Sequence, residues 1–185
     1  KYFVIAFTLL SVLVQAQVQP DRMYNPNIRS VKLYKAGNIY SYPVIALNSN
    51  EALELHFDDL ESGVKNYYYS FELRNADWTP SVLRSFDYTK GFADVRITNY
   101  RNSSIAFTRY THYQAVIPDR NSAPSRSGNY LLRVFINGDT SRTVFTKRFL
   151  VVDNKATVTA QIQQPFNSNF YNTHQKVQVS VNTNG

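Results

Sequence analysis

The chain has 185 residues, a formal net charge of +7, 14 tyrosines, 12 phenylalanines and no cysteine. The lack of cysteine excludes a disulfide framework, so the fold must be held by an apolar core, and a chain of this length can bury roughly two thirds of its unfolded surface. The basic residues are scattered and do not form the cluster that a nucleic-acid-binding face requires.

The beginning of the chain has the pattern of a secretory signal peptide. Lys1 precedes the apolar run 3–14, and Val14-Gln-Ala16 fits a cleavage site. The run is too short to cross a membrane as a helix. We therefore expect residues 1–16 to be a signal peptide and residues 17–27 to be an N-terminal extension of the exported protein. A buried strand or helix is the alternative.

From residue 28 onwards, apolar and polar residues alternate with a period of two, which is typical of β-strands with one dry face. The alternation is clearest at Leu53, Leu55 and Phe57. Other strand-like runs are rich in β-branched and aromatic residues and span 31–34, 44–46, 67–73, 93–97, 105–117, 130–136 and 144–152. Asn137-Gly138 predicts a tight hairpin between the last two runs.

About eight short strands at this spacing predict an all-β fold, an immunoglobulin-like antiparallel β-sandwich, over residues 28–153. The polar, proline-containing segment 118–127 predicts an exposed loop. A new alternating run begins after residue 153, and a second one follows at 177–181. Two strands cannot form a stable domain alone, so we expect residues 154–185 to be the truncated start of a second β-domain.

Motifs for catalysis, cofactors or metals are weak in this chain. Asp58, Asp59 and Glu61 form the densest carboxylate cluster, which we interpret as a solvated strand-end loop, with a calcium loop as the alternative. Neither a Gly-x-Ser-x-Gly elbow nor a phosphate-binding loop occurs. No two histidines share one element at metal-ligand spacing; they are His56, His112 and His174. We expect no enzyme activity, cofactor or metal site.

Aromatic residues offer the best candidates for contacts. Trp78 is the only tryptophan, and we interpret it as a core anchor between two sheets, with an exposed platform for a sugar or a partner as the alternative. Consecutive tyrosines on a strand must face both sides of a sheet, so some aromatic surface should be exposed to a partner. The possible partner contacts are Tyr67, Tyr69, and Arg120 and Arg126 of the polar loop.

Two short signatures carry a resemblance to a known family. The first is Asn75-Ala-Asp77-Trp78, and the second is Ser127-Gly128-Asn129-Tyr130. In this order, with Arg109-Tyr-Thr-His-Tyr113 between them, they resemble the first domain of type IX secretion system plug proteins, from about residue 28 to residue 152. We expect six of these residues to form a structural signature of the domain: Asn75, Asp77, Trp78, Gly128, Asn129 and Tyr130.

The resemblance implies a periplasmic protein of the Bacteroidetes type that closes the periplasmic opening of an outer-membrane translocon β-barrel. It implies this barrel as the partner, association with the outer membrane through the barrel, no direct membrane insertion, no small-molecule substrate and no nucleic acid. A barrel wide enough for folded cargo is an open leak unless something closes it.

Two other functions remain open. One is a carbohydrate-binding or cell-surface β-sandwich module that assists glycan uptake, with Tyr67, Tyr69, Trp78 and Asn75 as its platform. The other is an accessory domain of an exported hydrolase.

Overall fold

The structure is a computed structural model and describes residues 21–105 and 107–183. The expected signal peptide, 1–16, and residues 17–20 of the expected extension lie outside the described residues. Among the described helices, none is long and apolar enough to cross a membrane. The helices are short: α1 spans Ser85–Tyr88 and the 3₁₀ helix η1 spans Ser168–Phe170.

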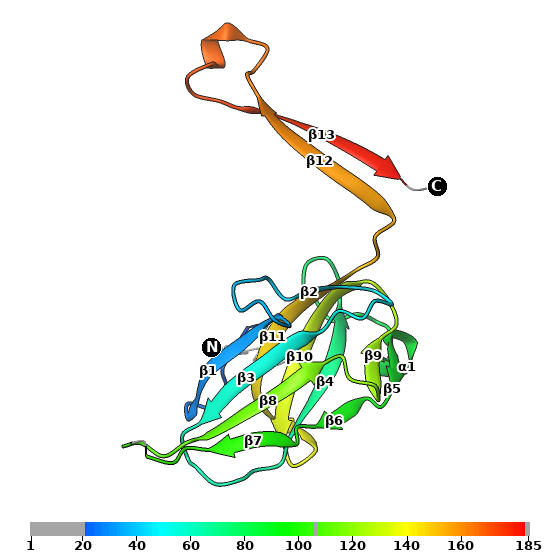
Figure 1. The fold of residues 1–185 in the computed structure, drawn as a ribbon. Helices are drawn as coiled ribbons and strands as arrows, with labels where there is room; N and C mark the ends of the chain where they lie inside the picture. Colours follow the sequence, from blue (N-terminus) through cyan, green and yellow to red (C-terminus); the bar gives the residue numbers. More distant parts are fainter. Residues whose placement is uncertain (1–20, 106, 184–185) are drawn as a thin grey trace, which may run out of the picture.

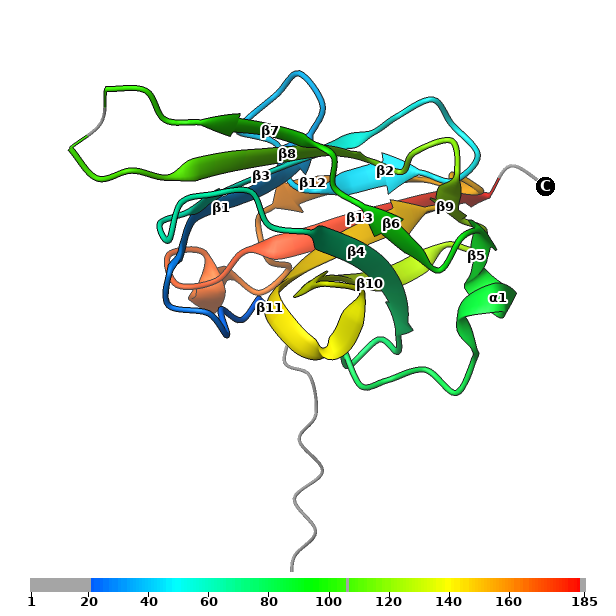
Figure 2. The same ribbon diagram turned by 90° about the horizontal axis from the view of Figure 1, so that it is seen from below.

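Two sheets face each other and form a sandwich (Figures 1 and 2). The first has the strand order β1-β3-β8-β7, formed by Ile28–Lys35, Leu53–Asp59, Thr111–Ile117 and Asn99–Asn102. The second has the order β2-β11-β10-β4-β6, formed by Val44–Ala46, Asp139–Val152, Gly128–Ile136, Tyr67–Arg74 and Asp94–Arg96. This order follows the immunoglobulin pattern and confirms the expected all-β sandwich. One pairing, β2 with β11, is parallel.

Aromatic rings from both sheets form the core between them. The alternation in β3 buries Leu53, Leu55 and Phe57. The Phe57 ring meets the Tyr67 ring of β4 and the Phe145 ring of β11, with both pairs of centroids 5.1 Å apart. Edge-to-face ring pairs of this kind stabilise a core beyond their buried area.

The second signature begins β10 and fixes its position. The Tyr130 hydroxyl donates a hydrogen bond to the Arg126 carbonyl oxygen at 2.9 Å, and the Tyr130 side chain is buried. A tyrosine that bonds to the backbone a few residues upstream is the tyrosine corner of immunoglobulin-like folds. At the other end of β10, the predicted hairpin is confirmed, because Asn137 and Gly138 both have positive φ angles, 57° and 71°.

The expected single strand over 105–117 is wrong. The structure has β7 at Asn99–Asn102 and β8 at Thr111–Ile117, and the chain reverses between them. Ile105 and Phe107 lie between the two strands and continue the apolar alternation of β8, so periodicity alone does not locate the reversal.

The expected loop 118–127 contains a short strand, β9, at Ser122–Pro124, which pairs with β5 at Thr89–Gly91. Only glycine fits at the end of β5. The φ angle of Gly91 is +87°, and a Cβ atom there would lie 2.0 Å from the Asn121 carbonyl oxygen.

Within the described residues, the last two strands pair with each other and with no other strand. β12 spans Ala156–Gln163, β13 spans Lys176–Thr183, and their antiparallel ribbon stands apart from the sandwich (Figure 1). That they begin a second domain stays a prediction.

Candidate functional site

The first signature forms a tight turn directly after β4. The Asn75 backbone N–H donates to the Thr79 carbonyl oxygen at 2.9 Å, and the Trp78 N–H donates to the Asn75 carbonyl oxygen at 2.9 Å. The Thr79 N–H and hydroxyl both donate to Asp77 Oδ1, at 3.0 and 2.6 Å. These two bonds, the hydroxyl bond first, lower the pKa of the Asp77 carboxyl. The Asn129 side chain donates to the Asn75 carbonyl oxygen at 3.1 Å, so the two signatures meet.

Trp78 lies in this turn and not between the sheets, so its expected role as an inter-sheet anchor is wrong. Its side chain is half-buried at the surface, and its φ angle is +66°. A bulky residue is strained in this left-handed conformation, typically by about 1–3 kcal/mol, and such strain is concentrated at functional sites. The guanidinium of Arg148 lies over the indole ring, 5.1 Å from its centroid.

Trp78 borders a largely apolar hollow of about 640 Å³, which we call the Trp78 groove. It lies between the start of the described chain, β1, the segment before β2, and β11. Its lining residues are Asp21, Leu33, Tyr42, Pro43, Val44, Trp78, Lys147, Arg148, Phe149 and Leu150.

The side chains that line the groove carry more positive than negative charge. Asp21 forms an ion pair with Arg148, and its Oδ1 atom lies 4.0 Å from Lys147 Nζ. Two cations therefore share one carboxylate beside an apolar floor. Tyr42 at the rim is 86% exposed. An apolar hollow with an aromatic wall and surplus positive charge can hold an aromatic or aliphatic anchor next to a carboxylate.

Two of the expected contact residues are not at the surface, so that part of the prediction is wrong. Tyr67 is 0% exposed and Tyr69 is 2% exposed. The strand alternation of β4 turns both into the core and leaves Tyr68 on the outer face. Arg120 and Arg126 are exposed, so the structure does not join them with these tyrosines. The glycan platform that would need Tyr67 and Tyr69 fails for the same reason.

The expected solvated carboxylate cluster is also wrong at Asp59. Asp59 is 0% exposed and accepts hydrogen bonds from the Tyr67 hydroxyl at 2.9 Å and the Glu61 backbone N–H at 3.0 Å. Its Oδ2 atom lies 2.7 Å from Lys65 Nζ. Burial, followed by the bond to Asp59, raises the pKa of the Tyr67 hydroxyl. The alternation carried this signal, since position 59 follows 53, 55 and 57 on the dry face.

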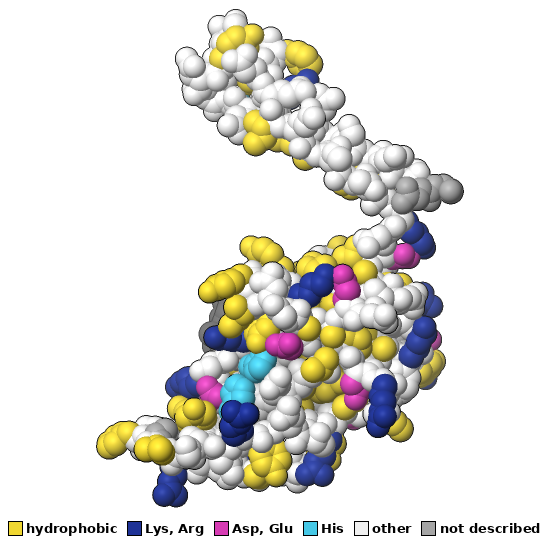
Figure 3. Space-filling model, viewed as in Figure 1, with side chains coloured by type: hydrophobic (Ala, Val, Ile, Leu, Met, Phe, Trp, Pro, Cys, Tyr) yellow, Lys and Arg dark blue, Asp and Glu magenta, His cyan; other side chains and the backbone are white. Residues whose placement is uncertain are grey.

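Pairing of β3 with β8 creates a polar cluster that the sequence did not reveal. His112 lies 2.7 Å from Asp58 Oδ1 and 3.1 Å from His56 Nδ1, and the Tyr34 ring stacks on His56 at 5.4 Å. Figure 3 shows adjacent histidine side chains, coloured cyan, on the surface of the molecule. Within residues 21–105 and 107–183, no group of three or more His, Cys, Asp or Glu side chains could hold a metal ion. We therefore interpret this cluster as a surface hydrogen-bond network.

Comparison with known proteins identifies the domain. The model of the type 9 secretion system plug protein 1st domain matches residues 28–153. The crystal structure of a hypothetical protein from Parabacteroides merdae ATCC 43184 is 30% identical with a TM-score of 0.80. That match covers 90% of this chain and 42% of the Parabacteroides chain, so this chain spans less than half of that protein.

A Pseudomonas fluorescens alkylpurine DNA glycosylase bound to DNA is 11% identical with a TM-score of 0.30, over 65% of this chain and 30% of the glycosylase chain. No curated protein matches the chain.

Proposed function

Because this chain belongs to the family of type 9 secretion system plug proteins, we propose that it is a non-enzymatic plug in the periplasm. It closes the periplasmic opening of the outer-membrane translocon barrel of that secretion system. Closure requires a rigid body that occupies the opening, and the aromatic sandwich core supplies that rigidity.

The Trp78 groove is the surface that we assign to the barrel contact. Both family signatures are used to build it: the first holds Trp78 in a strained turn, and Asn129 of the second fastens that turn. Tryptophan and arginine are the residues most often responsible for binding energy at protein interfaces. Here Trp78 and Arg148 are stacked together at the surface. An interface of modest size around one aromatic anchor would let the plug be displaced when cargo passes.

Replacing the indole should weaken binding far more than it weakens folding. We expect Trp78→Ala to reduce the free energy of unfolding by about 1 kcal/mol, because the side chain is half-buried and contributes one surface cation–π contact. We expect the affinity for the purified barrel to fall at least about 30-fold, which equals about 2 kcal/mol. Urea unfolding and binding to the immobilised barrel measure the two effects.

The matched control is Phe86→Ala, an exposed aromatic on α1 that does not line the groove. This variant should bind the barrel like the parent protein. Unchanged binding of Trp78→Ala would exclude the groove as the contact. A stability loss of about 3–5 kcal/mol would instead show that the indole is a core group.

A further inference from the structure

The β7–β8 ribbon projects from the body of the sandwich, as both ribbon views show (Figures 1 and 2). Its pairing extends beyond the strands themselves. The Ser103 backbone N–H donates to the Tyr110 carbonyl oxygen at 2.9 Å, and the Tyr110 N–H donates to the Ser103 hydroxyl at 3.0 Å. The described residues beyond this pair, 104–105 and 107–109, are therefore held away from the body of the sandwich on an ordered stem.

Two large apolar side chains lie beyond the end of the stem. Ile105 is 97% exposed, and Phe107 is as exposed as in an extended peptide, at 107%. Single exposed apolar residues are common on protein surfaces. Here the two are neighbours on a projecting segment, where neither contacts the sandwich. Apolar area displayed in this way is typical of an interaction site.

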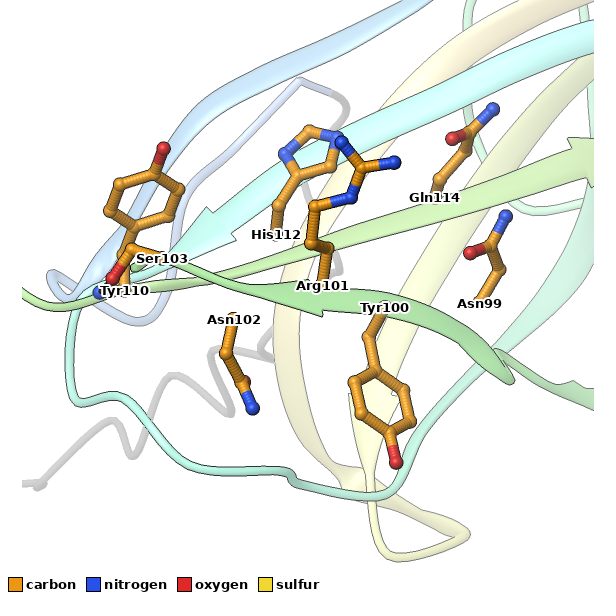
Figure 4. A pocket seen from close by; sticks show the side chains of 8 residues that line it. All are labelled: Asn99, Tyr100, Arg101, Asn102, Ser103, Tyr110, His112 and Gln114. Atoms are coloured by element: carbon orange, nitrogen blue, oxygen red, sulfur yellow. Dashed lines mark hydrogen bonds between the residues drawn. The ribbon is translucent and has the colours of Figure 1, made fainter. Parts of the chain in front are cut away.

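The stem carries only positive charge. Between Asn99 and Gln114 the sequence contains Arg101 and Arg109 and no aspartate or glutamate. Both arginines are exposed, and neither forms an ion pair with the part of the chain that the structure describes. Figure 4 shows Arg101 and Tyr110 among the residues that line a shallow pocket along the ribbon. The apolar tip is thus bordered by cations and by tyrosine.

We propose that the tip of this ribbon anchors the protein shallowly in an anionic lipid surface. Ile105 and Phe107 enter the boundary between headgroups and acyl chains, and Arg101 and Arg109 contact the lipid phosphates. Apolar side chains flanked by arginine and tyrosine are the pattern of interfacial anchors. A lipid surface also accepts a two-residue tip of any shape, whereas a protein socket requires a complementary cavity.

This anchoring goes beyond the proposed plug function and does not depend on it. It departs from the expectation of no direct membrane insertion, although only the tip would enter the lipid. An anchored plug would search for its barrel along the membrane surface. That would raise its effective concentration at the barrel.

Vesicle sedimentation tests the anchoring directly. The full chain should bind vesicles of phosphatidylcholine with phosphatidylglycerol and should bind pure phosphatidylcholine much less. We expect the double variant Ile105→Ser/Phe107→Ser to lower the partition coefficient at least tenfold. Arg101→Gln/Arg109→Gln should lower it severalfold, and added salt should reproduce that loss for the parent protein. The control is Val82→Ser/Phe86→Ser, which removes two exposed apolar side chains near and on α1.

Tip insertion also has a depth readout. In Phe107→Trp, brominated acyl chains should quench the fluorescence of the new indole and should leave the fluorescence of Trp78 unchanged. Vesicle binding that is unchanged in Ile105→Ser/Phe107→Ser would overturn the proposal, because it would show adsorption through another surface. If the parent protein does not bind the anionic vesicles, the proposal is overturned too, and loss of barrel binding in Ile105→Ser/Phe107→Ser would then identify the tip as a protein contact. Equal thermal melts of parent and variants exclude misfolding.

Discussion

Raising the pH above about 10 should unfold this protein steeply. Five tyrosines lie in the core of the described residues, and burial is the largest cause that raises the pKa of each hydroxyl, to about 12 for Tyr130. Tyrosine in an unfolded chain has a pKa of about 10. Above that pH the unfolded state loses protons that the folded state keeps. The free energy of unfolding then falls by up to about 1.4 kcal/mol per pH unit for each tyrosine.

The titration of Lys65 also lowers the stability of the protein as the pH rises. Burial alone would lower its pKa, but the hydrogen bonds and charges of Asp59 and Glu61 together outweigh burial and raise it. Its contribution to stability is present below an unfolded pKa of about 10.4 and is lost as the pH rises through the folded value. For the five tyrosines together, the free energy of unfolding should fall by roughly 7 kcal/mol per pH unit. A typical domain stability of about 5–15 kcal/mol would then be lost within one to two pH units.

Circular dichroism and phenolate absorbance, recorded in one alkaline titration, measure this effect. The buried tyrosines should ionise together with the loss of β-structure, after the exposed tyrosines have titrated. If all tyrosines ionised near pH 10 while the sandwich stayed folded, the aromatic core described here would be wrong.

Removing the buried carboxylate of Asp59 should cost about 3–5 kcal/mol of stability. Asp59→Ala leaves the Tyr67 hydroxyl buried without its acceptor and deprives Lys65 of its buried carboxylate partner, so that only Glu61 remains paired with it. Breaking one side of a buried ion pair is typically this destabilising, because the remaining groups cannot regain full hydration. Urea unfolding measures the loss.

The neighbouring carboxylate offers a matched control. Asp58 is 19% exposed, on the opposite face of β3, and pairs with His112. Asp58→Ala should therefore cost about 1 kcal/mol or less. Equal losses in the two variants would show that Asp59 is as well solvated as its neighbour.

Much of the fold could be predicted from local patterns. The period of two in β3 identified its dry face, and Asn137-Gly138 identified the hairpin, because strand pleating and turn geometry depend on adjacent residues. The same alternation rule predicts two further buried sites. The alternation that buries Phe57 also buries Asp59, and the alternation of β4 buries Tyr67 and Tyr69.

The Trp78 groove could not be predicted in this way. It depends on where β4 ends, on the positive φ angle of Trp78, and on an arginine 70 positions further along the chain. The pairing of His56 with His112 likewise depends on the register between β3 and β8. Periodicity within a strand carries no information about register between strands. Periodicity does not locate the reversal between β7 and β8, because Ile105 and Phe107 lie between the strands and continue the apolar alternation of β8.

Envelope permeability in the host tests the proposed plug function most directly. Uptake of a large antibiotic or dye is compared in four strains: the parent, a deletion of this gene, a deletion of the translocon barrel, and the double deletion. The plug account predicts a leak only in the strain that lacks this protein and retains the barrel. The intact gene should close that leak, and the Trp78→Ala gene should close it poorly. Unchanged permeability in the single deletion, or a leak that persists without the barrel, would contradict the account.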